Sequence, residues 1–314
     1  MYKKFEKWHG CKNDFIIMYT SDHESEMVKN SLIKLAPRFC AKDGDGIGAD
    51  GVLLLQTKLP DDPLPYKLTI INSDGTIALN CGNGLRVAAL SSRKRSLELD
   101  PVSGPCELVS LQVEGKDFHC RFSESSSKAA PYVNVDMGVA VSNDELSWHK
   151  DSVSRMKAFA DEHGLAFSKD DVSSTDLGNP HIVWKLDEAS RPLLHKVGPK
   201  IQDFFDGGGI NLHLVKEEEI TSDDQSQAVI HTGKKITERY TMFCWERGAG
   251  PTQACGSGAT SVGAASLCAG FLSEDEWIAV DMPGGRVYIS KDSATGHMVL
   301  CGPGKFIFEG TIEI

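Results

Sequence analysis

Short apolar runs of strand length recur along the first 120 residues. They occupy residues 15–19, 52–55 and 67–71, and polar or glycine-containing segments separate them. Between the first two runs, residues 27–40 carry apolar side chains spaced about one helical turn apart. Runs of four to six apolar residues are typical of buried strands, whereas the 3.6-residue spacing is typical of an amphipathic helix. We therefore predict three strands here, with a helix between the first and the second.

A polar run at residues 123–128 is the best candidate boundary between two halves of the chain. After it, residues 132–137 alternate as a new strand does, residues 144–163 have helical spacing, and residues 180–184 form another apolar run. Residues 278–289 contain two apolar runs around a Pro-Gly-Gly turn, which predicts a hairpin. The second half is therefore expected to mix strands and helices as the first does.

Two stretches are predicted to lie on the surface, since residues 58–65 are rich in Pro and Asp, and residues 216–235 are charged and polar. The latter is expected to be an excursion away from the core. The chain ends in predicted strands around residues 298–301 and 305–312. Many short strands with two or more helices in each half indicate an α+β fold.

Composition limits the possible partners. The 314 residues are 40% apolar and 25% charged, which suits a protein of two globular domains. The net charge of −11 argues against nucleic acid or an anionic membrane as the main partner. The first residues are polar, and no apolar run approaches the ~20 residues that span a bilayer, so we expect a cytoplasmic protein.

Cysteine and histidine spacing argues against metal binding and disulfides. The nine cysteines include no C-x-x-C pair, and the ten histidines include no H-x₃₋₅-H pair. Zinc sites and thiol-redox proteins normally carry such pairs, and an odd cysteine count fits reduced thiols. Residues 46–51 do satisfy G-x-G-x-x-G, but a strand follows them where a dinucleotide site needs a helix. We expect no metal and find nothing that demands a cofactor.

The most informative pattern is a repeated Cys-Gly-x-Gly, which begins at Cys81 and again at Cys255 and runs into small, helix-competent residues. Each thiol is therefore predicted to lie at a helix N-terminus, where free N–H groups and the helix dipole favour negative charge. Such a setting can lower a thiol pKa from about 8.5 to roughly 3.5–7.5. Two such helices could hold one carboxylate, with a thiol on either face of its α-carbon. One thiolate would then remove a proton while the opposite thiol delivers one.

Five segments, in order along nearly the whole chain, resemble diaminopimelate epimerase, a cofactor-independent amino-acid epimerase of lysine and peptidoglycan-precursor biosynthesis. The segments are residues 10–15, 48–51, 72–86, 178–181 and 246–258. The resemblance implies two pseudo-symmetric domains, each a curved, mostly antiparallel sheet around a central helix, with the active site in the cleft between them. It also implies a homodimer, and a last strand that returns to the first domain. The expected domains are residues 1–130 plus 302–314, with Cys81, and residues 131–301, with Cys255.

The resemblance also assigns roles to residues. Cys81 and Cys255 would be the acid/base pair, and His181 and Glu246 would tune the thiols. The positions that match the family's substrate-binding residues are Asn13, Asn72, Gly82, Asn83, Asn179, Asn211, Glu246, Arg247, Gly256 and Ser257. A racemase of the same fold that acts on proline or hydroxyproline remains an alternative, as does, from another class, a thiol-redox protein. The Asn-Cys-Gly-Asn-Gly and Glu-Arg-Gly sequences favour diaminopimelate.

Two local features bear on these roles. Glu246 and Arg247 are adjacent, so in a regular strand their side chains would point to opposite faces. Both can reach one ligand only if the chain bends, which Gly248 and Gly250 permit. Lys12 stands where the family usually has glycine.

Overall fold

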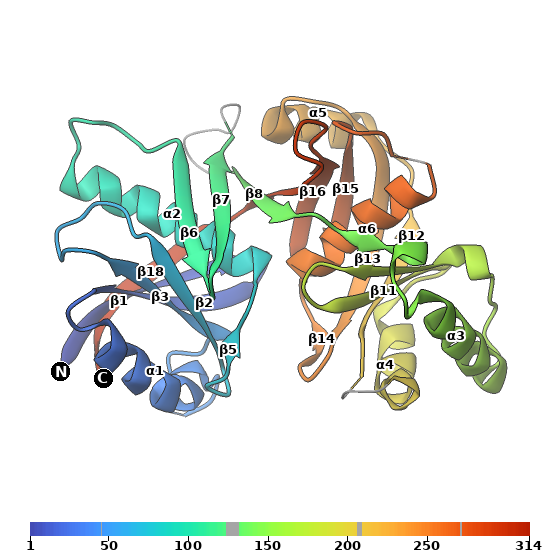
Figure 1. The fold of residues 1–314 in the computed structure, drawn as a ribbon, viewed down its shortest axis with the longest axis horizontal. Coiled ribbons are helices and arrows are strands. Elements are labelled where there is room, and N and C mark those ends of the chain that lie inside the picture. Colours follow the sequence, from blue (N-terminus) through green and yellow to red (C-terminus); the bar gives the residue numbers. More distant parts are fainter. Residues whose placement is uncertain (45, 124–131, 206–208, 271) are drawn as a thin grey trace. The chain divides into compact units, whose positions relative to one another are not determined.

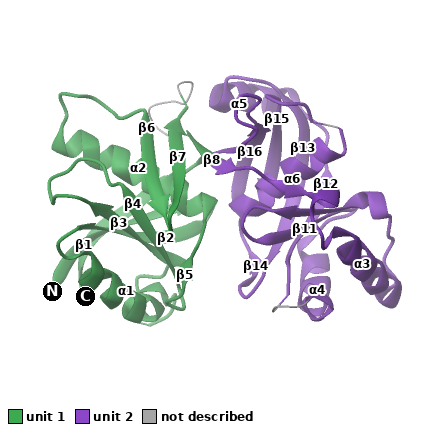
Figure 2. Cartoon of the chain, in the orientation of Figure 1, with its two compact units in different colours: residues 1–136, 302–314 green, residues 137–301 purple. Residues whose placement is uncertain are grey.

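The chain forms two compact units, which are coloured separately in Figure 2. Unit 1 comprises residues 1–136 and 302–314, and unit 2 comprises residues 137–301. The structure is a computed structural model that describes residues 1–44, 46–123, 132–205, 209–270 and 272–314. Most of the polar run that predicts a boundary, residues 124–128, lies outside the described residues, as does Asp45.

Unit 1 is a curved mixed sheet with one helix against each face (Figure 1). Its strands pair in the order β18–β1–β2–β3–β4–β6–β7–β8, antiparallel except for the parallel pairs β2–β3 and β4–β6. The elements are β1 (Tyr2–Gly10), β2 (Asn13–Ser21), α1 (Ser25–Cys40), β3 (Gly51–Thr57), β4 (Lys67–Asn72), β5 (Ile77–Ala78), α2 (Gly82–Leu99), β6 (Leu108–Val113), β7 (Lys116–Phe122), β8 (Tyr132–Gly138) and β18 (Lys305–Glu313).

The apolar runs of unit 1 are continuous because both faces of its central strands are covered. Ile16 and Met18 of β2 pack in one cluster with the apolar face of α1, which includes Val28 and Leu32. The intervening Ile17 is also fully buried, and it points to the opposite face. On that second face lies α2, which contacts β1, β2, β3, β6 and β7. The predicted strands and the predicted helix of this half are therefore confirmed.

Unit 2 repeats this arrangement. Its strands pair in the order β9–β10–β11–β12–β13–β15–β16–β17, with β11–β12 and β13–β15 parallel and the other pairs antiparallel. The elements are β9 (Val141–Ser142), η1 (Asn143–Glu145), α3 (His149–His163), η2 (Lys169–Asp171), β10 (Val172–Asp176), β11 (Pro180–Lys185), α4 (Arg191–Ile201), η3 (Gln202–Phe204), β12 (Asn211–Glu217), α5 (Ser222–Thr232), β13 (Ile236–Glu246), β14 (Gly250–Thr252), α6 (Gly256–Cys268), β15 (Trp277–Met282), β16 (Gly285–Lys291) and β17 (Met298–Pro303).

The two units have the same pattern of parallel and antiparallel pairs, taken strand by strand from β18 and from β9. In this correspondence α6, which contacts β9, β10, β11, β12, β15 and β16, takes the place of α2. The predicted α+β fold of two pseudo-symmetric domains, each a sheet around a central helix, is confirmed.

Two sequence predictions for unit 2 need correction. Residues 144–163 are not one helix, because Leu146 is extended, with φ −94° and ψ 120°, and separates η1 from α3. Residues 216–235 are only partly an excursion, since they include the end of β12 and the helix α5. A capping box between Thr221 and Asp224 starts α5, and Ala228 of this helix is fully buried. The charged residues mask this helix because its buried face is narrow.

Asp224 lies at the centre of an ion cluster that joins α5 to the sheet. Its carboxylate accepts hydrogen bonds from Arg286 (2.7 Å) and Arg239 (3.2 Å), and from the Thr221 hydroxyl (2.6 Å). Both arginines also bind Asp281. Burial alone would raise the pKa of Asp224, but the hydrogen bonds from Thr221 and Arg286 hold it below its ordinary range.

The turn between β1 and β2 has a conformation that favours glycine at position 12. Gly10 pairs with Asn13, so Cys11 and Lys12 form a two-residue turn, and their φ angles are +53° and +60°. Two positive φ angles define a type I′ turn, which favours glycine at its second position. Lys12 therefore occupies a strained conformation here.

Among the helices of the described ranges, none is both long and apolar enough to cross a membrane.

Candidate active site

Each unit places a cysteine at the start of its central helix, as the repeated motif predicts. Cys81 is the N-cap of α2 and Cys255 is the N-cap of α6, both with extended backbones. The sulfur of Cys81 accepts the N–H of Gly84 at 3.3 Å, and that of Cys255 accepts the N–H of Gly258 at 3.3 Å. The two thiols therefore have the same local geometry, with the first free N–H groups of a helix beside them.

In unit 1, Asn13 and Asn72 lie at the ends of central strands of the sheet. Asn13 begins β2, and Asn72 ends β4, where it pairs with the first residue of β3, Gly51. Because β2 and β3 are parallel and β4 is antiparallel to β3, the start of β2, the start of β3 and the end of β4 lie side by side. The side chain of Asn72 is exposed, and its amide donates to Thr76 at 2.9 Å within the following turn.

Asn13 and Asn83 belong to one hydrogen-bond network that links these strand ends to α2. Asn83 donates to Asn13 at 3.2 Å, and Asn13 donates to Asp50 at 2.9 Å. On the other side, Arg86 donates to the amide oxygen of Asn83 at 2.7 Å. The side-chain orientations of both asparagines are thus set by charged neighbours.

Asp50 and Arg86 are the residues here whose roles the sequence analysis missed, although both lie in segments that carry the resemblance. Asp50 also accepts a hydrogen bond from Lys42 at 2.7 Å. Burial would raise its pKa, but the bonds from Lys42 and from the backbone of Asp14 lower it. Arg86 is fully buried, and its guanidinium donates to the carbonyl oxygen of Pro303 at 3.2 Å. It thereby ties the start of α2 to the returning C-terminal segment.

Unit 2 gathers its predicted residues at the corresponding strand ends. Asn179 directly precedes β11, Asn211 begins β12, and Glu246 ends β13. Asn211 accepts the backbone N–H of Arg247 at 2.9 Å and donates to the carbonyl oxygen of Pro180 at 2.8 Å. Its amide therefore joins the segment that carries Asn179 and His181 to the segment that carries Glu246 and Arg247.

The chain bends after Glu246, as the glycines that follow permit. Gly248 and Gly250 have φ angles of +80° and +79°, and Gly250 turns back to pair with Glu246. Arg247 lies in this bend with an exposed side chain, while Glu246 stays half-buried at the end of the strand. The bend frees the two side chains from the alternation of a regular strand.

Burial changes the protonation state expected for the Cys255 thiol. The thiol is 4% exposed, and this burial, together with the charge of Glu246, raises its pKa well above the ordinary value. The predicted lowering by the helix N-terminus is therefore wrong for Cys255, because the loss of hydration outweighs the N–H groups. The hydrogen bonds from Ser257 and Gly258 act in the opposite direction.

His181 lies at the start of β11 and is fully buried. Its Nε2 is 3.0 Å from the amide oxygen of Asn179, and its Nδ1 is 2.9 Å from Nε2 of His213. Burial lowers the pKa of His181 well below its ordinary value, and His213 and Arg247 add to this effect. His213 belongs to no recognisable motif, but its place two residues after Asn211 on one strand puts it on the same face of the sheet as that residue.

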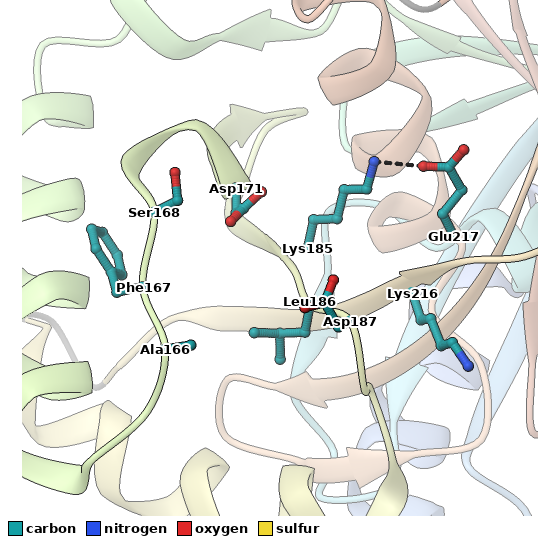
Figure 3. A pocket seen from close by; sticks show the side chains of 9 residues that line it. All are labelled: Ala166, Phe167, Ser168, Asp171, Lys185, Leu186, Asp187, Lys216 and Glu217. Carbon is teal, nitrogen blue, oxygen red and sulfur yellow. Dashed lines mark hydrogen bonds and ion pairs between the residues drawn. The ribbon is translucent and has the colours of Figure 1, made fainter.

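The cavity in Figure 3 is separate from these residues. It has a volume of about 520 Å³ and lies by the last residues of β11 and β12, Lys185 and Glu217, whose side chains form an ion pair at 2.6 Å. His181 is the second residue of β11 and Asn211 the first residue of β12, so both lie at the opposite end of these strands. None of the predicted site residues lines this cavity.

Comparison with solved structures gives the class of fold. The chain is similar to a structure described as a predicted epimerase from Pseudomonas aeruginosa, with a TM-score of 0.64, 14% identity and 99% of each chain covered. It is also similar to a hydroxyproline epimerase from Agrobacterium vitis, with a TM-score of 0.60 and 10% identity, covering 99% of this chain and 92% of the other. The fold is therefore the one that these proteins share.

Comparison of sequences gives the family. The family model for diaminopimelate epimerase matches residues 5–141 and 173–307. The diaminopimelate epimerase of Bacillus subtilis is 30% identical, covering 98% of this chain and 97% of that protein, and that of Bacteroides thetaiotaomicron is 29% identical, covering 99% and 98%. The chain belongs to the diaminopimelate epimerase family and is an isomerase. The resemblance seen in the sequence is confirmed.

Proposed function

We propose that this protein interconverts LL- and meso-diaminopimelate by moving a proton at one α-carbon, with Cys81 and Cys255 as the acid and base. The observation that carries the proposal is the duplicated half-site. Each thiol caps a central helix and accepts the N–H of the third residue along at 3.3 Å. Core packing alone gives no reason for two thiols in the same unusual setting.

The carboxylate at the reacting centre is proposed to bind the N–H groups of Gly82 and Asn83 in one half-site and of Gly256 and Ser257 in the other. These residues are the first of α2 and α6, where helix N–H groups have no intrahelical acceptor. Negative charge that develops when the α-proton leaves would be stabilised by the same groups.

The remaining assigned residues are proposed to bind the two amino-acid ends of the substrate. Carboxylate and ammonium groups need donors and acceptors, which these residues provide as amides, a carboxylate and a guanidinium. The residues are Asn13, Asn72, Asn179, Asn211, Glu246 and Arg247. The proposal gives Arg247 a distal carboxylate, which a guanidinium can grip with two hydrogen bonds.

Each thiol serves as acid in one direction and as base in the other. The raised pKa of Cys255 means that this thiol holds its proton in the state that the structure describes. For Cys255 to act as base, its thiolate must be stabilised, and the bonds from Ser257 and Gly258 favour that form. His181 and Glu246 are proposed to adjust the same equilibrium.

On the family resemblance we further propose that the enzyme works in the cytoplasm as a homodimer, in lysine biosynthesis. No cofactor is part of the proposed reaction, since the two thiols supply both proton transfers.

The test is incubation with LL-diaminopimelate in deuterated water, followed by mass spectrometry and chiral separation. The expected product is meso-diaminopimelate that carries one deuterium. Cys81→Ala and Cys255→Ala should each abolish conversion, whereas Cys268→Ala, which changes an exposed thiol, should not. Exchange into proline or hydroxyproline without exchange into diaminopimelate would overturn the substrate assignment.

A further inference from the structure

His213 is a buried titratable residue that has no part in the proposed proton transfer or substrate binding. It lies on β12, is fully buried, and stacks against His181 with ring centroids 5.1 Å apart. Its ring also packs on α6, since a Cβ added to Gly258 would lie 2.3 Å from His213 Cε1. The residue therefore connects the strand that carries it to the first turn of the helix that Cys255 caps.

The hydrogen-bond partners define which nitrogen carries each hydrogen. The amide oxygen of Asn179 can only accept, so Nε2 of His181, at 3.0 Å, is the donor. A neutral His181 then has a lone pair on Nδ1, and Nε2 of His213, at 2.9 Å, must donate to it. Burial lowers the pKa of His213 to about 3 and lowers that of His181 well below its ordinary value, so each ring carries a single hydrogen at neutral pH.

The surroundings of the second ring nitrogen of His213 agree with a hydrogen bond donated from His213 to His181. Nδ1 of His213 is buried and has no hydrogen-bond partner among the described residues. In the direction deduced above, this atom is an unpaired acceptor. In the reverse direction it would be an unpaired buried N–H, and two lone pairs would face each other between His181 and Asn179.

We propose that His213 is a positioning residue that, through His181, orients the side-chain amide of Asn179. His213 donates to His181, and His181 donates to the amide oxygen of Asn179. The NH₂ group of Asn179 is then left to face the substrate. This inference rests on the proposed role of Asn179 in substrate binding. It adds a residue that fixes the amide orientation and the tautomer of His181 together.

The test compares His213→Phe, His213→Gln and wild type. Phenylalanine fills the same space on Gly258 without a donor, while the Nε2 amide of glutamine can still donate to His181. His149→Phe is the matched control, since His149 is a partly buried histidine of the same unit whose Nδ1 lies 2.9 Å from the Ser174 hydroxyl.

The first readout is ¹⁵N NMR of the histidine rings, which reports tautomers whether or not the protein is active. In wild type, both rings should carry hydrogen on Nε2. In His213→Phe the Nδ1 signal of His181 should shift to the position of an unbonded nitrogen, and His213→Gln should restore it. Hydrogen on Nδ1 of His181 in wild type would overturn the inference, even if the phenylalanine variant did not fold.

The second readout is epimerisation kinetics. Losing the preferred orientation of one binding amide should raise KM on the order of tenfold, the equivalent of one hydrogen bond, and change kcat little. Glutamine should recover most of this loss, and the His149 variant should match wild type. An unchanged KM in a folded His213→Phe would refute the positioning role. Failure of wild type to epimerise would instead refute the proposed function and leave the NMR result standing.

Discussion

Replacing Gly258 by alanine tests how closely His213 packs on the Cys255 helix. A Cβ at this position would lie 2.3 Å from Cε1, 2.7 Å from Nε2 and 2.8 Å from Nδ1 of His213. The ring has little room to move, because it is fully buried and bonded to His181. Overpacking of this kind costs about 1–3 kcal/mol, against a gain of about 1 kcal/mol for alanine over glycine in a helix. Because the Cβ would overlap a buried ring that has little room to move, we take the upper end of this cost and expect Gly258→Ala to lower the free energy of unfolding by about 2 kcal/mol.

Gly84 provides the matched control, since it occupies the same place after Cys81. A Cβ there would lie 3.3 Å from Cδ2 of Leu53, the mobile end of a side chain, and 3.4 Å from Cys81. Small adjustments can relieve these contacts, so Gly84→Ala should change stability by less than about 0.5 kcal/mol or increase it. Urea unfolding followed by circular dichroism measures both variants. If Gly258→Ala were as stable as Gly84→Ala, the close contact between His213 and α6 would be refuted.

The ion cluster around Asp224, the buried thiol of Cys255 and the β1–β2 turn can each be tested by substitution or chemical modification. Asp224→Asn should lower the free energy of unfolding by about 3 kcal/mol at pH 7 in urea titrations. Because the folded pKa of Asp224 is depressed, its contribution is present above the ordinary pKa and is lost as the pH falls, so the difference between variant and wild type should shrink between about pH 5 and pH 3; a constant difference would contradict this. Peptide mass mapping should show that iodoacetamide modifies buried Cys255 far more slowly than exposed Cys268 at pH 7, because burial both shields the Cys255 thiol and raises its pKa. Equal rates for the two thiols would contradict this burial, and a Cys255 rate that levels off below pH 9 would contradict the raised pKa. Lys12→Gly should raise stability by about 0.5–1 kcal/mol in the same urea assay by relieving the left-handed turn, and a loss would count against that strain.

The sequence predicted the parts of the fold that depend on local patterns. The period of apolar residues located the strands around Ile16 and Val52, and the Cys-Gly-x-Gly motifs located two helix starts, because the glycines and small residues act within one turn. The break before α3 was not predictable, since Leu146 is apolar and fits helical spacing. Its extended backbone follows the short 3-10 helix η1, in which the N–H of Leu146 donates to the carbonyl oxygen of Asn143 at 2.8 Å.

In the candidate site too, residues in local motifs could be predicted, whereas residues that act through distant contacts could not. Asn13, Asn179 and Arg247 could be assigned by resemblance, because their segments are recognisable one by one. The roles of Arg86 and His213 could not, since each depends on a contact between elements far apart in the chain. The sign of the Cys255 pKa shift also depends on burial, which a motif does not report.

The central claim, that two thiols act on opposite faces of one carbon, is tested most directly by the first turnovers in deuterated water. A donor thiol exchanges its proton with solvent, while the proton taken from the substrate stays on the other thiol. At low conversion of LL-diaminopimelate, we therefore expect every meso product molecule to carry one deuterium and the recovered substrate to carry almost none. Product that keeps the original hydrogen at the inverted carbon would show that a single base carries the proton across, and would contradict the account.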